Sequence, residues 1–240
     1  MTISFPIHSN HLHLFAYTNA HLLKGKTEGI VIDFHGLNGG MRILREDPEA
    51  AIIYARHRAL YIYPYYGPWS WMNDTAIRTV DAVVEAAMMK YQLSDGIPIV
   101  ATGGSMGGLG ALVYTVYAAC TPVACAVNSP VCDLLYHYTE REDVPRTLYH
   151  AFAHYPCDLE TAIASSSPLH LAYRMPDIPY YLVHGFEDRE VSKQAHSDAF
   201  FQTLHTIRRI QYIEVPGMNH CALRDDQLER YYAFVFSYIG

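Results

Sequence analysis

The stretch Ile97-Pro98-Ile99-Val100-Ala101-Thr102-Gly103-Gly104-Ser105-Met106-Gly107-Gly108 decides the predicted fold. Its β-branched residues predict a strand over 97–102, and the helix-forming run after Gly108 predicts a helix. Gly103 and Gly107 lie two positions on either side of Ser105, where larger side chains would collide with a sharp turn. A serine between a strand and a helix in a Gly-x-Ser-x-Gly motif is the pattern of a nucleophile elbow.

The elbow motif predicts that the Ser105 hydroxyl acts as a nucleophile. Free backbone N–H groups at a helix N-terminus stabilise negative charge, so the Met106 N–H is a predicted oxyanion donor. The alternative is a glycine-rich turn with an incidental serine, and the strand-turn-helix context favours the nucleophile. A serine hydroxyl also needs an imidazole base, which a carboxylate must orient.

Short apolar runs alternate with longer amphipathic stretches along the chain, which predicts parallel strands joined by crossover helices. Asp47 looks like the N-cap of a helix that runs from Ala50 to about Arg58, and a second helix starts near Asn73 or Asp74. Further helices are expected after Ser105, over 192–206 and from 224 to the C-terminus. The predicted strands are 11–17, 29–34, 60–64, 97–102, 123–128, 178–184 and 210–215.

The segment 132–177 is far longer than an ordinary connection between a strand and a helix. It is rich in tyrosine, histidine and charged residues, and we expect a small helical cap insertion over the site. With 240 residues, half of them hydrophobic, the chain is expected to form a single domain over 1–240.

Gly104 to Gly108, followed by Gly110-Ala111, resemble the elbow of small esterases of the feruloyl esterase and esterase D type. Over the whole chain, the order of motifs resembles the α/β-hydrolase superfamily, including the catalytic domain of prolyl oligopeptidase-like proteins. The resemblance implies an α/β-hydrolase fold, with a mostly parallel central sheet flanked by helices. It also implies a serine hydrolase whose residues follow the order serine, acid, histidine.

Two loops carry the remaining predicted oxyanion donor and the acid. The predicted strand 29–34 is followed by the loop His35-Gly36-Leu37-Asn38-Gly39-Gly40. The resemblance implies that this loop supplies the other oxyanion donor, with the Leu37 N–H preferred and the Asn38 N–H as the alternative. His35 is expected to support this loop.

The run 184–191 resembles the His-Gly-x-x-Asp-x-x-Val signature of the acid loop, so Asp188 is the predicted acid. Glu187 and Asp133 are its competitors.

Position in the chain selects the base from 14 histidines. His220 follows the last predicted strand in a glycine-containing loop, where the superfamily places its base, whereas His196 and His205 fall within a predicted helix. The aromatic loop over 64–73 leaves the sheet at the same edge as Ser105. Tyr66 and Trp69 are therefore candidate pocket residues, although such rings could equally cover the core.

Composition limits the partners and cofactors. A net charge of −7 without blocks of like charge argues against nucleic acid or an anionic membrane as partner. The five scattered cysteines indicate reduced thiols, and neither a signal peptide nor a long apolar stretch is apparent, so a cytoplasmic protein is expected. His8, His11 and His13 lack a nearby carboxylate or cysteine, so no metal is predicted there. We expect no cofactor, and homo-oligomer formation stays open.

Three functions compete. The first is a carboxylic ester hydrolase that acts through an acyl-enzyme on a small or medium ester. The second is a prolyl oligopeptidase-like serine peptidase, which the acid loop also resembles, although 240 residues leave no room for the large β-propeller of that group. The third is a non-catalytic binding protein that keeps the fold, which is less favoured because competent residues occupy all three triad positions.

Overall fold

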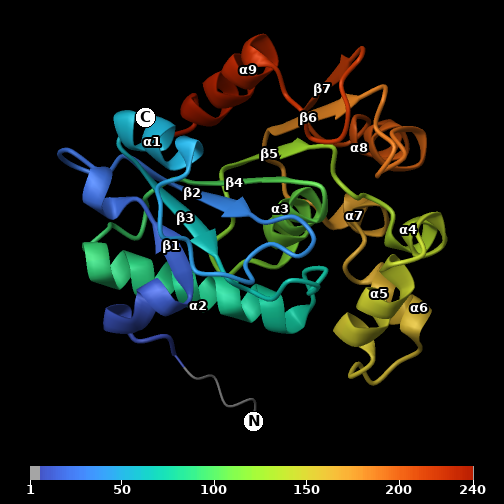
Figure 1. Cartoon of the computed structure of the whole chain (residues 1–240), viewed down its shortest axis with the longest axis horizontal. Coiled ribbons are helices and arrows are strands. Elements are labelled where there is room, and N and C mark those ends of the chain that lie inside the picture. The colour runs from blue at the N-terminus through green and yellow to red at the C-terminus, as the bar shows by residue number, and fades with distance from the viewer. Residues whose placement is uncertain (1–5, 240) are drawn as a thin grey trace.

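The computed structural model describes residues 6–239 as one seven-stranded sheet with helices on both faces (Figure 1). The strand order is β1-β3-β2-β4-β5-β6-β7, in which only β1 is antiparallel to its neighbour. The predicted sheet, mostly parallel and flanked by helices, is therefore confirmed. Its strands are β1 (Ala16–Thr18), β2 (Gly29–Phe34), β3 (Ala59–Pro64), β4 (Ile99–Gly104), β5 (Ala124–Asn128), β6 (Tyr180–Gly185) and β7 (Ile210–Val215).

The two faces of the sheet carry different helices. On one face pack α1 (Glu49–Arg56) and α9 (Asp225–Phe236). On the other pack α2 (Asp74–Tyr91), α3 (Met106–Tyr117) and α8 (Ala199–Leu204). Because both faces are covered, the central strands are almost continuously buried, as in β5 and β6.

Four helices lie between β5 and β6, within the segment that was expected to form a cap. They are α4 (Leu134–Glu140), α5 (Val144–Phe152), α6 (Leu159–Ala164) and α7 (Pro168–Leu171), followed by the short 3-10 helix η3 (Ala172–Arg174). Figure 1 shows α4, α5 and α6 grouped at one end of the molecule, beside the carboxyl ends of the strands. The segment between β5 and β6 is thus largely helical, and the cap insertion over 132–177 stays a prediction.

The register brings the carboxyl ends of the central strands to one edge. Phe34 of β2 pairs with Gly103 of β4, and Gly104 pairs with Asn128 of β5. The loops that follow these residues start side by side. In a parallel sheet this is the edge where catalytic groups gather.

The N-terminal prediction was wrong in part. The expected strand 11–17 is mostly the 3-10 helix η1 (Ser9–Leu14), and only Ala16–Thr18 pairs with β3. His8 starts η1 because its Nδ1 accepts a hydrogen bond from the Asn10 N–H at 3.3 Å. A local side-chain bond therefore competes with the strand that alternation suggested.

Helix starts also differ in detail from the sequence-based expectation. Pro48, not Asp47, is the N-cap of α1, because the Asp47 carboxylate instead accepts hydrogen bonds from Tyr17 and His21. Asn73 caps α2 as expected, accepting from the Ala76 N–H at 2.9 Å. The single helix expected over 192–206 is a π-helical turn (Gln194–Asp198, η4) that continues into α8.

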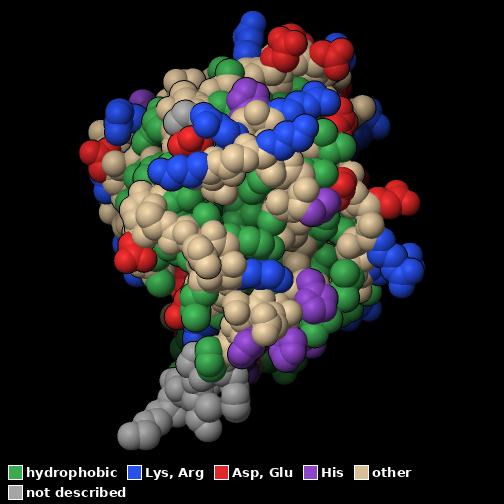
Figure 2. Space-filling model, turned by 90° about the vertical axis from the view of Figure 1, so that its left-hand side faces the viewer, with side chains coloured by type: hydrophobic (Ala, Val, Ile, Leu, Met, Phe, Trp, Pro, Cys, Tyr) green, Lys and Arg blue, Asp and Glu red, His purple; other side chains and the backbone are tan. Residues whose placement is uncertain are grey.

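Charged side chains are mixed on the face shown in Figure 2, where basic groups lie beside acidic and uncharged ones. Within residues 6–239, no helix combines the length and apolar character needed to cross a membrane. The expectations about nucleic acid, membranes and location stay predictions.

The close approach of Gly107 to the end of β2 predicts the effect of one substitution. A Cβ at Gly107 would lie 1.9 Å from the carbonyl oxygen of Phe34, whereas one at Gly96 would meet nothing within 4 Å. We expect Gly107→Ala to lower the free energy of unfolding by about 2 kcal/mol or more, because α3 must move away from β2. Urea unfolding followed by circular dichroism measures this, with Gly96→Ala as the matched control. Equal midpoints for the two variants would contradict the packing described here.

Candidate active site

Ser105 occupies a strained turn between β4 and α3. Its backbone has φ 58° and ψ −126°, a conformation that a residue with a side chain rarely adopts. The Ser105 N–H donates to the Asn128 carbonyl at 3.0 Å, and a Cβ at Gly103 would lie 2.4 Å from the Gly107 carbonyl oxygen. The glycines are therefore required by the turn, and the half-buried serine lines a cleft.

His220 and Asp188 meet although 32 residues separate them. The His220 Nδ1 lies 2.7 Å from Oδ2 of Asp188, whose side chain is completely buried. The other carboxylate oxygen of Asp188 accepts hydrogen bonds from the N–H groups of Glu190 and Val191, at 2.9 and 3.0 Å. With Nδ1–H donating to the carboxylate, the His220 Nε2 is left to accept a proton.

The structure brings neither competing acid to His220. Glu187 is exposed. Asp133 is the N-cap of α4, where its carboxylate accepts from the N–H groups of Leu135 and Tyr136 at 3.0 and 3.1 Å. Of the three carboxylates considered from the sequence, Asp188 is the one that contacts the histidine.

The Asp188–His220 contact changes the proton affinity of both groups. Burial opposes the charged form of each group. At Asp188, the hydrogen bonds from His184, His220 and the Val191 N–H together outweigh burial, so the pKa of this carboxyl falls well below its usual range. The contact with Asp188 raises the pKa of His220 above the usual 6.5, against the effect of burial. An imidazole with a raised pKa takes up the proton of a serine more readily.

Two backbone N–H groups near Ser105 were expected to bind an oxyanion: that of Leu37, which lines the same cleft, and that of Met106, the next residue in the chain. Neither the Leu37 N–H nor the Met106 N–H has an acceptor within residues 6–239. The Asn38 N–H, the second choice from the sequence, donates instead to the Pro68 carbonyl at 3.0 Å. The geometry therefore favours Leu37 over Asn38.

His35 holds the loop that carries Leu37. Its Nδ1 bonds the Gly36 carbonyl at 3.0 Å, and its ring stacks on Tyr66 with centroids 4.1 Å apart. Tyr66 is buried and donates its hydroxyl to the His35 carbonyl, while the Trp69 indole N–H donates to the Asn38 side chain. Tyr66 and Trp69 therefore support the loop, and these two candidate pocket residues are not among those that line the cleft.

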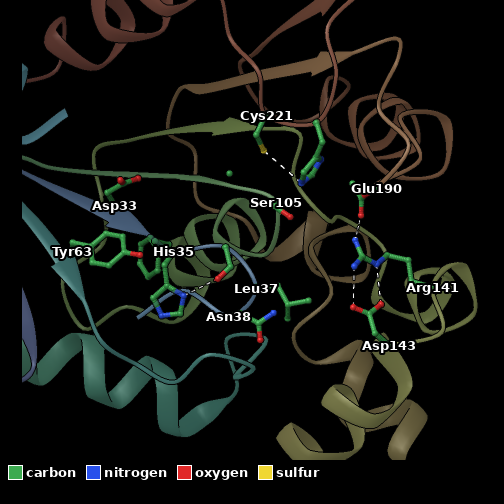
Figure 3. Close-up of a pocket in the computed structure, with 14 residues that line it drawn as sticks. Asp33, His35, Leu37, Asn38, Tyr63, Ser105, Arg141, Asp143, Glu190 and Cys221 are labelled. Carbon is green, nitrogen blue, oxygen red and sulfur yellow. Dashed lines mark hydrogen bonds and ion pairs between the residues drawn. The ribbon is translucent and has the colours of Figure 1, made fainter. Parts of the chain in front are cut away.

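The cleft has a volume of about 620 Å³ and runs across Ser105 (Figure 3). Arg141, Asp143 and Glu190 lie at one end in Figure 3, and Asp33 and Tyr63 lie at the other. None of these five residues was singled out from the sequence, because their approach depends on how the loops pack. The lining residues are Asp33, Phe34, His35, Gly36, Leu37, Asn38, Tyr63, Gly104, Ser105, Arg141, Asp143, Glu190, His220 and Cys221.

His184 is a positioning residue that sequence reasoning missed. It is fully buried, and its Nε2 lies 3.1 Å from both Oδ2 of Asp188 and the Val191 carbonyl. Its Nδ1 lies 2.6 Å from the Ser197 hydroxyl. Because a carbonyl can only accept, Nε2 carries the proton, and the ring fixes the acid loop. The signal was present, since His184 is the first residue of the acid-loop motif.

A second cluster joins the insertion to the acid loop. Oε2 of Glu140 lies 2.6 Å from Nδ1 of His137 and 2.8 Å from Nε2 of His196, and its other oxygen accepts from the Ser192 N–H at 2.7 Å. These spacings would suit a metal ion. However, Nδ1 of His196 accepts from two backbone N–H groups, so Nε2 carries the proton and has no lone pair for a metal. The cluster is therefore a hydrogen-bonded link between α4 and the acid loop.

Comparisons with known proteins bear on the family and the fold of the chain. A family model described as the prolyl oligopeptidase family matches residues 72–240. A comparison with curated protein sequences gave no significant match. The structure of acylaminoacyl peptidase from Pyrococcus horikoshii superposes with a TM-score of 0.72 at 16% identity, covering 89% of this chain and 37% of that one. This chain thus spans little more than a third of that peptidase.

Two esterase structures are similar over more of their own length. Esterase B from Lactobacillus rhamnosis gives a TM-score of 0.70 at 14% identity, covering 90% of this chain and 76% of the esterase. The thermophilic esterase from Thermogutta terrifontis with propionate bound gives 0.63 at 17% identity, covering 92% and 85%. At these identities the likeness shows the fold, and it confirms the predicted α/β-hydrolase fold.

The pair Asp188–His220 predicts how the reactivity of Ser105 depends on pH. Protonated His220 cannot take the serine proton, so labelling by a fluorophosphonate should decline as pH falls through the pKa of His220, with its midpoint above 6.5. Asp188→Asn removes the charge that raises this pKa. We expect the midpoint to move to lower pH and the rate to drop about a thousandfold or more.

Asp133→Asn is the matched control, because it alters the competing carboxylate without touching His220. This variant should keep the wild-type profile. An unshifted midpoint in Asp188→Asn, or a shifted one in Asp133→Asn, would show that the acid is assigned to the wrong residue.

Proposed function

The chain belongs to the prolyl oligopeptidase family of serine hydrolases, and we propose that it is a carboxylic ester hydrolase that acts through an acyl-enzyme on a small or medium ester. The observation that carries the proposal is the 2.7 Å contact of His220 with Asp188, because His220 lines the same cleft as Ser105. In this proposal Ser105 is the nucleophile, His220 the general base and Asp188 the acid that orients it.

Acylation begins when the Ser105 Oγ attacks the ester carbonyl carbon and the His220 Nε2 takes the hydroxyl proton. The carbonyl oxygen becomes an oxyanion, which the N–H groups of Leu37 and Met106 stabilise. Collapse of this intermediate breaks the bond to the leaving alcohol, and His220 returns the proton to that alcohol. The acyl group is then an ester of Ser105.

Deacylation repeats these steps with water. His220 takes a proton from the water as its oxygen attacks the acyl carbon, and the same two N–H groups hold the second oxyanion. The Ser105 oxygen leaves with the proton from His220, and a carboxylic acid is released. The protein groups named here suffice for this cycle, so the proposal includes no cofactor.

The dimensions of the cleft support a compact substrate. A volume of about 620 Å³ lies within the usual range of small-molecule pockets. Arg141 and Asp143, which line it, come from the insertion between β5 and β6, and so we propose that 132–177 acts as a cap over the substrate. The two esterases with similar folds also support an ester substrate.

A serine peptidase is the second candidate. The family model and the similarity to acylaminoacyl peptidase favour it. A peptide requires the same triad and oxyanion donors, but an amine is a poorer leaving group than an alkoxide or phenoxide. The two functions are therefore separated by substrate and not by site residues.

A series of p-nitrophenyl esters from acetate to decanoate tests the proposed function. We expect wild-type turnover to be greatest for the shorter acyl chains, and Ser105→Ala and His220→Ala each to lower it by about 10³ to 10⁶. Release of p-nitrophenolate measures the rate. An aminoacyl p-nitroanilide is assayed alongside it.

The outcomes separate the candidates. Cleavage of the anilide alone would favour the peptidase, and full ester turnover by folded Ser105→Ala would refute the mechanism. Absence of turnover with every substrate would favour a non-catalytic binding protein.

A further inference from the structure

Asp33 lies at the end of the cleft away from Arg141 and has no part in the mechanism above. It is on β2, pairs in register with Thr102 of β4, and precedes the loop that carries Leu37. Figure 3 shows Asp33 and Tyr63 on one side of Ser105 and the Arg141 group on the other. A substrate bound at Ser105 can therefore extend toward the Asp33 carboxylate.

The Asp33 carboxylate is held in place by neutral groups. Its Oδ2 accepts from the Tyr61 hydroxyl at 2.7 Å, and its Oδ1 accepts from the Thr102 hydroxyl at 3.0 Å. Within residues 6–239, no Lys, Arg or His makes an ion pair with it. Each carboxylate oxygen can accept a further hydrogen bond. The negative charge is thus fixed in position and uncompensated.

Burial makes this charge costly. It raises the pKa of Asp33 to about 6, even though the hydrogen bonds from Tyr61 and Thr102 act in the opposite direction. Above that pH the ionised carboxylate faces the cleft without a counter-ion. A cation entering the cleft would supply the missing charge, because a nearby positive charge favours the ionised form of a carboxyl group.

An aromatic side chain completes the Asp33 end of the cleft. Tyr63 lines it beside Asp33, and its ring centroid is 5.9 Å from that of His35. Carboxylates and the faces of aromatic rings both attract ammonium ions. Their combination here indicates an alkylammonium ligand.

The opposite end of the cleft does not offer a site for anions. The Arg141 guanidinium is paired through two hydrogen bonds with Asp143, at 3.0 and 2.9 Å, and also with Glu190. Two carboxylates against one guanidinium leave a net charge of −1. Both ends of the cleft are therefore negative, so a positively charged substrate is attracted and an anionic one is repelled.

We propose that Asp33, with Tyr63 beside it, is a specificity site for a substituted ammonium group on the substrate of Ser105. The substrate class is then a cationic ester, with the charged group on the side of the ester that points toward β2. That the ligand is an ester hydrolysed at Ser105 rests on the proposed function, but binding of an ammonium group at Asp33 can be tested without turnover.

Turnover is tested with choline butyrate and its uncharged isostere, in which a quaternary carbon replaces the nitrogen. A second pair carries the trimethylammonium group, or its carbon isostere, on the acyl side of a p-nitrophenyl ester. At a pH at least one unit above the pKa of Asp33, we expect wild type to prefer the charged member of one pair about tenfold in kcat/KM. In Asp33→Asn this preference should fall toward parity.

Asp81→Asn is the matched control, because Asp81 on α2 also accepts a hydrogen bond from a tyrosine, Tyr114, at 2.8 Å, but lies outside the cleft. It should keep the full preference. A second variant neutralises the Arg141 group (Arg141→Gln with Asp143→Asn and Glu190→Gln) and decides the matter if Asp33→Asn does not fold. If this variant still prefers the charged ester, the result supports Asp33 as the site. If it loses that preference, the assignment to Asp33 is overturned.

Binding of choline to Ser105→Ala, measured by calorimetry against its uncharged isostere, separates this inference from the proposed function. Choline binding that is lost in Ser105→Ala with Asp33→Asn supports the site even if no ester is hydrolysed. Equal binding of the two alcohols, equal turnover of both ester pairs by wild type, or a preference that survives in Asp33→Asn would overturn it.

Discussion

The approach of α3 to the end of β2 is the constraint on which the rest of the site depends. Gly107 lies so close to the Phe34 carbonyl that no side chain fits between them, and Gly103 in turn lies against Gly107. This contact joins the strand that carries the oxyanion loop to the helix that starts at Met106. Leu37 is thereby brought to the cleft that Ser105 lines, and the strained conformation of the serine is held by its bond to the Asn128 carbonyl. The free energy stored in this turn is offset by the continuously buried sheet around it.

A second support holds the acid. Asp188 receives two backbone N–H groups and contacts His184 as well as His220, and so its carboxylate has little freedom to turn. Glu140 bonds the same loop at Ser192, which connects α4 of the insertion to the acid loop. The insertion therefore does two things at once: it lines the cleft through Arg141 and steadies the loop that orients His220.

Local patterns were enough to predict most of the fold. The strands β2 and β7 match their predicted ranges, and the elbow, the acid loop and the loop of His220 lie where the motifs placed them, because each depends on neighbours in sequence. The strand predicted over 11–17 was wrong in part, because the His8 side chain starts a 3-10 helix that the alternation of polar and apolar residues does not reveal. The loop alone could not decide whether Tyr66 and Trp69 line the pocket or cover the core, and Asp33 and Arg141 were not foreseen. Which side chain faces the cleft is decided by packing between segments distant in sequence, and a single sequence contains no direct signal for it.

The negative ends of the cleft bear on what happens after hydrolysis. In the proposed ester hydrolysis, the carboxylic acid released from Ser105 would be formed as a carboxylate between Asp33 and the pair Asp143 and Glu190, which line the cleft. Like charges in a partly buried space repel, so under the proposed function the cleft would favour release of this product. An enzyme built in this way would suffer little product inhibition and could continue to work where its acid product accumulates.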